Sequence, residues 1–145
     1  MKTGIQVHQS LNELDRNSLL YEKMTLMYFG ITHQIHNKIQ ILGETRWAMG
    51  GNYGAYAEGI IGFSTPIINF NEFTLTTPIQ MVIAAGGGVD VGKGIGLQFN
   101  LSADYHFAKT SSLSFSVGKL NFIDGNYSPI SYNINFKQNL FFYSK

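Results

Sequence analysis

The chain has 145 residues, a length that suits one domain over residues 1–145 with a closed core. Only 13% of the residues are charged, about half of the usual fraction, and the net charge is +1. The sequence has no cysteine and no basic cluster, which excludes disulfide and thiolate chemistry and gives no reason to expect a nucleic-acid partner.

Apolar and polar residues alternate along most of the chain, and this period predicts β-strands. In chain order we expect strands over residues 5–11, 20–33, 38–49, 53–63, 73–91, 93–107, 112–122 and 130–142. The stretch 20–33 also fits a helical period, but its Thr25, Tyr28 and Phe29 favour a strand. The clearest run is 93–107, which at about 3.3 Å per residue is long enough to cross a bilayer at a tilt.

Polar and glycine-rich segments separate these strands. Turn or loop signals occur at 12–18, Gly50-Gly51-Asn52, 64–72, Gly92-Lys93-Gly94 and Asp124-Gly125, and 64–72 is the longest loop expected in the centre of the chain. Pro78 cannot donate to a ladder, so we expect the strand to break there or to leave the sheet. After Gly118 the apolar phase shifts to Leu120 and Phe122, which predicts a bulge.

About eight strands joined mostly by short turns favour an all-β fold, an antiparallel up-and-down barrel, because closure removes exposed edges. A soluble lipocalin-like barrel would enclose the apolar face around a small apolar ligand, whereas a transmembrane barrel turns that face outward. The polar faces carry mainly Asn, Ser, Gln and Gly, which favours a hydrogen-bonded lumen and a transmembrane barrel. Several aromatic residues fall near expected strand ends and fit membrane-interface girdles: Trp47, Tyr53, Phe63, Tyr105, Phe107, Phe141, Phe142 and Tyr143.

The size, the strand rhythm and the aromatic-rich final strand 135–143, together with segments 53–59 and 85–92, resemble the small outer-membrane β-barrels of Gram-negative bacteria. This resemblance implies a place in the bacterial outer membrane, in contact with the lipid bilayer and lipopolysaccharide. It also implies that the barrel-assembly machinery recognises the final strand, although this chain adds Ser144 and Lys145 after the terminal aromatic residue. Met1 to Ser10 lack the apolar core of a signal peptide, so we expect a mature form or a fragment.

The strand phases place six ionisable residues on the lumen side: Glu44, Arg46, Glu58, Asp104, His106 and Lys137. Opposite charges in a narrow interior must pair to offset their desolvation, so we expect a structural charge network. The functional alternative to a structural network is that these charges form a constriction that selects an ion or a solute. An eight-stranded lumen is normally filled by side chains, so a wide, porin-like pore is not expected. The function expected is structural, adhesive or partner-binding, with a protein partner in a membrane complex and with no cofactor or metal.

One enzymatic alternative starts from His8 and Ser10, two residues apart on the first strand, with Glu22 on the next. This arrangement is similar to that of the outer-membrane lipid A deacylases. The resemblance implies Ser10 as nucleophile, His8 as base and Glu22 as the carboxylate that orients it. The sequence departs from that family by placing the motif at the start of the barrel and by having Leu11 after the serine.

Overall fold

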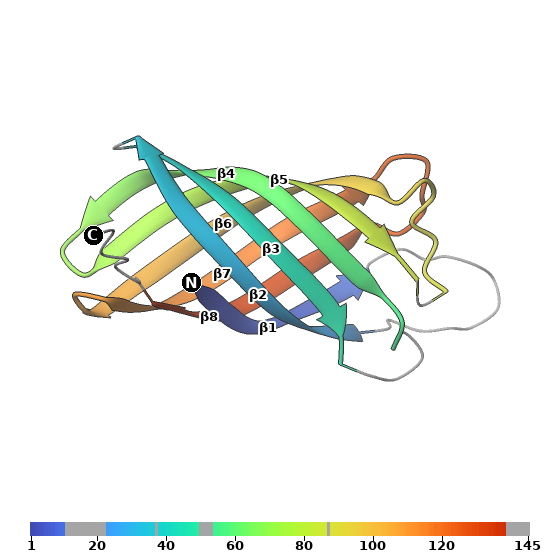
Figure 1. The fold of residues 1–145 in the computed structure, drawn as a ribbon, viewed down its shortest axis with the longest axis horizontal. Coiled ribbons are helices and arrows are strands. Elements are labelled where there is room, and N and C mark those ends of the chain that lie inside the picture. The colour runs from blue at the N-terminus through green and yellow to red at the C-terminus, as the bar shows by residue number, and fades with distance from the viewer. Residues whose placement is uncertain (11–22, 37, 50–53, 87, 139–145) are drawn as a thin grey trace, which may run out of the picture.

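In a computed structural model, the described residues, 1–10, 23–36, 38–49, 54–86 and 88–138, contain eight strands that form one closed antiparallel barrel (Figure 1). Each strand pairs with the next along the chain, and β1 pairs with β8 to close the barrel. The strands are β1 (Lys2–Ser10), β2 (Lys23–His36), β3 (Ile39–Ala48), β4 (Ala57–Phe70), β5 (Phe73–Ala85), β6 (Ile95–Ala108), β7 (Ser111–Phe122) and β8 (Pro129–Gln138). The prediction of a closed barrel of about eight antiparallel strands is confirmed.

Within the described residues, no helix is long and apolar enough to cross a membrane.

The two ends of the barrel differ in their connections. Met1 lies at the end of the barrel that carries the short connections β2–β3, β4–β5 and β6–β7 (Figure 1), and we call this end the terminal end. The β4–β5 turn is only Asn71 and Glu72, and Asn71 adopts a positive φ of 47°. The opposite end, which we call the loop end, carries the longer connections β1–β2, β3–β4, β5–β6 and β7–β8.

Exposed and buried residues alternate along the strands, as in the pattern eBeBeBeBeBeeee of β6, where e is exposed and B is buried. Each strand has a large apolar side chain on the outside, for example Ile5, Phe29, Trp47, Ile61, Ile79, Phe99, Phe115 and Ile134. The buried inner face is largely polar, with Gln6, Glu44, Arg46, Glu58, Gln80, Gln98, Asp104, Ser114 and Asn133 among its members. The barrel is therefore apolar outside and polar inside.

The prediction of a loop over 64–72 is wrong, because β4 continues to Phe70 and only two residues separate it from β5. The ladder between β4 and β5 shifts register between Pro66 and Ile68, so the strand accommodates the proline by an irregularity instead of ending. The break expected at Pro78 is also wrong. The proline pairs with Ser64 inside β5, while the ladder to β6 has no pair between Thr76 and Ile79.

The bulge expected after Gly118 is not found, because β7 pairs with β6 without a register shift from Gly118 to Phe122. Leu120 and Phe122 stay on the inward-facing side that Ser112 and Ser114 occupy, and both are buried. The change of pattern therefore reflects a change in the lumen, which becomes apolar towards the loop end. The turn at Asp124, which has a φ of 60°, lies in a wider loop between Phe122 and Pro129 than a two-residue hairpin.

Candidate functional site: the polar lumen

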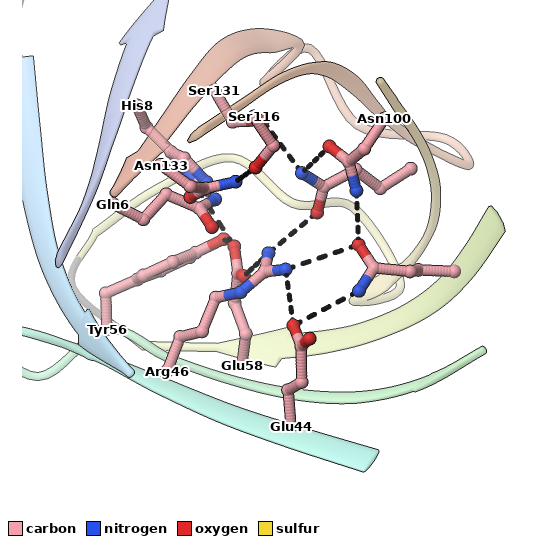
Figure 2. A network of polar contacts seen from close by, with 12 residues as sticks. Gln6, His8, Glu44, Arg46, Tyr56, Glu58, Asn100, Ser116, Ser131 and Asn133 are labelled. Carbon is pink, nitrogen blue, oxygen red and sulfur yellow. Dashed lines mark hydrogen bonds and ion pairs between the residues drawn. The ribbon is translucent and has the colours of Figure 1, made fainter. Parts of the chain in front are cut away.

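The centre of the lumen is organised around Arg46, which projects inward from β3 and is 2% exposed. Its Nη1 donates to Glu58 Oε2 at 3.0 Å, and its Nη2 donates to Glu44 Oε2 at 3.0 Å (Figure 2). Arg46 and Glu58 are direct partners in the β3–β4 ladder, and Glu44 lies two residues before Arg46 on the same face of β3. The two carboxylates offset the desolvation of the buried guanidinium and orient it.

Side-chain amides from β5 and β6 extend these ion pairs into a ring. Arg46 also donates to Gln98 Oε1 at 2.7 Å and to Gln80 Oε1 at 3.3 Å. Asn100 closes the ring, because it accepts from Gln98 at 2.9 Å and donates to Gln80 at 2.6 Å. Gln80 Nε2 in turn donates to Glu44 Oε2 at 3.1 Å. The ring therefore ties β3, β5 and β6 together through the interior.

A second group of polar residues lies on the loop-end side of Arg46. Tyr56 Oη donates to Glu58 Oε1 at 2.7 Å, and His8 Nδ1 lies 3.1 Å from Tyr127 Oη and 3.8 Å from Glu58 Oε1. Nε2 of the fully buried His8 contacts the Gln6 amide nitrogen. Burial and the neighbouring Glu58 carboxylate raise the pKa of Tyr56, a loop residue just before β4, so its hydroxyl remains a donor.

Beyond this group, an apolar cluster fills the loop end. Its buried members there are Met24, Leu26, Ala48, Tyr56, Val82, Ala84, Val91, Leu120 and Phe122, with Val89 and Tyr127 packed against them. The cluster also includes Ile60, opposite Glu44 in the β3–β4 ladder, and Leu42, which lies on the terminal-end side of Arg46 on β3. The ring of Tyr127, from the β7–β8 loop, lies 6.1 Å from the ring of Phe122 and stacks on it. The same loop joins the β5–β6 loop through Tyr127 N and Asn126 Nδ2, which donate to Asp90 at 3.0 and 2.8 Å. The lumen is therefore closed at this end.

Two further ion pairs lie towards the terminal end. Lys137 on β8 contacts both carboxylate oxygens of Asp104 on β6 at 2.6 Å, and Lys2 lies 3.6 Å from Glu44. His106, expected in the same network, is exposed near the end of β6 and lies 3.0 Å from Thr74 Oγ1. It lies apart from the other charges because the last residues of β6 extend beyond the buried part of the lumen.

The structure thus brings together Glu44, Arg46 and Glu58, and separately Asp104 and Lys137. The sequence prediction missed the uncharged polar residues around Arg46 and its two carboxylates, namely Gln6, Tyr56, Gln80, Gln98, Asn100 and Tyr127, and it considered His8 only as a candidate base. Gln80, Gln98 and Asn100 lie on inward-facing positions that strand phase alone could have identified. Tyr127 lies outside the strands, so alternation gave no signal for it.

The aromatic residues expected at membrane interfaces occupy different heights on the outer face. Tyr105 and Phe107 lie near the terminal end, where their rings come within 5.0 Å of Phe73 and 6.1 Å of Phe136. Trp47 is exposed near the loop-end limit of β3. Phe63, in contrast, lies near the middle of β4, because that strand is longer than the sequence suggested. Tyr53, Phe141, Phe142 and Tyr143 lie outside the described residues.

The proposed deacylase-like residues are only partly described. His8 projects into the lumen, where Gln6 and Tyr127 contact its two ring nitrogens. The backbone of Ser10 ends β1 opposite Pro129, but its side chain and Glu22 lie outside what the structure describes. Among the described residues, no group of three or more His, Cys, Asp or Glu side chains is placed to hold a metal ion.

Comparison of the chain with protein-family models, curated proteins and solved structures found no match. The functional argument therefore depends on the geometry of the barrel itself. That geometry combines an apolar outer wall, a paired network of buried charges and a closed loop end.

Proposed function

We propose that this protein is an integral β-barrel of the bacterial outer membrane with a structural, adhesive or partner-binding role. One observation carries the proposal: large apolar side chains face outward on all eight of the described strands, while charged side chains are buried in the lumen. In water such a surface would form an apolar patch far larger than those of soluble monomers. In a bilayer the same surface is solvated by lipid, and the closed ladder satisfies the backbone groups.

A soluble lipocalin-like barrel is less well supported. Such a barrel needs an apolar interior to hold an apolar ligand. Here the centre of the interior holds Arg46, Glu44 and Glu58, and its apolar part is a packed cluster at the loop end. If this barrel were a soluble carrier, large outward side chains such as Phe63, which is 57% exposed, would lie in water.

The closed lumen favours a role for the outer surfaces over transport through a pore. The Arg46 ring crosses the interior, and the apolar cluster fills the loop end beyond it. The loops β5–β6 and β7–β8 are held together at Asp90, and Lys93 lies 3.1 Å from Asp124 across the same junction. In small outer-membrane barrels the long loops lie outside the cell. The β5–β6 and β7–β8 loops, joined by these contacts, therefore form a surface suited to adhesion or to a protein partner.

Refolding into lipid vesicles tests the membrane proposal. Unfolded protein diluted into vesicles should acquire β-structure and float with the lipid, whereas protein diluted into buffer should aggregate. Monodisperse, folded protein in detergent-free buffer would contradict it. For location, the chain would be exported in a Gram-negative host behind an added secretion signal, and the two membranes would then be separated. Recovery in the inner membrane or as soluble periplasmic protein would contradict the outer-membrane assignment.

A further inference from the structure

A cavity of about 270 Å³ lies in the lumen between the Arg46 ring and the terminal end. Its lining extends from Arg46 and Tyr28 to Asn69 and His106, which are exposed at that end of the barrel. The volume equals that of about nine molecules of liquid water. It therefore has room for a small organic molecule that enters from the terminal end.

One wall of this cavity carries buried polar atoms that lack hydrogen-bond partners within the described residues. They are Gln6 Oε1, Ser114 Oγ, Asn133 Oδ1 and Asn135 Oδ1. The four residues are neighbours, because Gln6 lies opposite Asn133 in the β1–β8 ladder and Ser114 lies opposite Asn135 in the β7–β8 ladder. Each is at least nine-tenths buried. Burying amide and hydroxyl groups is costly unless a partner is supplied, so this wall is suited to a ligand with several hydroxyl groups.

The charged groups around the cavity are already paired with one another. Lys137 pairs with Asp104, Lys2 with Glu44, and Arg46 with both Glu44 and Glu58. The lining itself carries three cationic side chains and two carboxylates, and Glu58, which pairs with Arg46 from its loop-end side, supplies the third carboxylate. Each charged side chain thus has an oppositely charged partner, so a charged ligand would enter without a free counter-charge. Lys137 Nζ nevertheless has three N–H groups and can donate to a neutral oxygen beside Asp104. The electrostatics of the lumen therefore select a neutral molecule.

We propose that the terminal-end cavity binds a small neutral polyol of about the size of a hexose. The polyol hydroxyls donate to the amide oxygens of Gln6, Asn133 and Asn135 and accept from the lysine ammonium groups. This site goes beyond a structural or adhesive role for the barrel. It depends on the interior alone, so it can be tested in detergent whether or not the barrel inserts into the outer membrane.

Saturation-transfer NMR on the folded protein, in a phosphocholine detergent that carries no sugar, tests the site with glucose and sorbitol as probes. We expect saturable binding of both, and weaker binding of the charged analogues gluconate and glucosamine. Asn135→Leu should weaken glucose binding about tenfold, the equivalent of one lost hydrogen bond. Ser114→Phe, which fills the cavity, should abolish it. Asn121→Leu is the matched control, because Asn121 is exposed at the loop end, and it should leave binding unchanged.

Circular dichroism and the urea midpoint show whether each variant folds. If Ser114→Phe does not fold, Ser116→Leu fills the same cavity from the neighbouring inward position of β7. The proposal is overturned if neither probe binds saturably, which would mean that the cavity holds water only. It is also overturned if a folded cavity-filling variant binds as the unmodified protein does, or if gluconate or glucosamine binds more tightly than glucose.

Discussion

Replacing Arg46 by Leu would remove the cation that two buried carboxylates share. Among the described residues, Glu58 would keep only the Tyr56 hydroxyl at 2.7 Å and the more distant His8 at 3.8 Å. Glu44 would keep Gln80 at 3.1 Å and Lys2 at 3.6 Å. Breaking a buried ion pair by removing one partner typically costs about 3–5 kcal/mol, because a charge is left uncompensated. We expect a loss of that size in the free energy of unfolding.

Urea unfolding of the barrel in detergent or lipid, followed by the fluorescence of Trp47, measures this loss. With a slope of about 2 kcal/mol per molar urea, the midpoint should fall by about 1.5–2.5 M. The control is Lys93→Met, which removes an exposed ion pair with Asp124 and should cost at most about 0.5 kcal/mol.

A triple variant separates the charge from the packing. Adding Glu44→Gln and Glu58→Gln to Arg46→Leu removes the unpaired carboxylates and should recover most of the lost stability. The reasoning is refuted if Arg46→Leu shifts the midpoint no more than Lys93→Met. It is also refuted if the triple variant is less stable than Arg46→Leu alone.

Three further perturbations test other parts of the structure. Gly118→Ala should destabilise the barrel by about 1–3 kcal/mol, because the added Cβ would overlap the Asn100 side chain. Gly59→Ala, where the added Cβ meets open space, should not destabilise it, and equal urea midpoints of the two variants would contradict this reasoning. Ile61→Arg, on the outer face of β4, should lower the folding stability in vesicles by about 2–4 kcal/mol, because it places a charge in lipid. Ile123→Arg, in a loop, should lower it much less, and similar losses for the two variants would argue against a lipid-facing outer wall. Lys137→Met alone should be more destabilising than Lys137→Met with Asp104→Asn, because the single variant leaves a buried carboxylate; the opposite order of urea midpoints would contradict the ion pair.

Strand phase predicted the residues that face inward on the central strands, since alternation depends only on local geometry. From this phase the sequence predicted that the inward charges pair with one another, but not which residues pair. The ladder register that places Arg46 directly opposite Glu58 was needed to make that contact specific.

Other features depend on contacts between segments far apart in the chain, which alternation does not encode. The ring through Gln80, Gln98 and Asn100 needs the curvature of the closed barrel to bring β5 and β6 across from β3. Tyr127 contacts the lumen from a loop. The inward apolar positions Leu120 and Phe122 looked like a bulge because the sequence reading assumed a uniformly polar interior.

Quenching of Trp47 fluorescence tests the central claim most directly, because this outward side chain on β3 is the only tryptophan in the chain. The protein would be refolded into vesicles of lipids brominated at different depths along the acyl chain. We predict strong quenching, greatest for bromines near the membrane interface because Trp47 lies near the end of its strand. Fluorescence that is unchanged by brominated lipid, from protein that is folded and monodisperse without detergent, would contradict the membrane barrel.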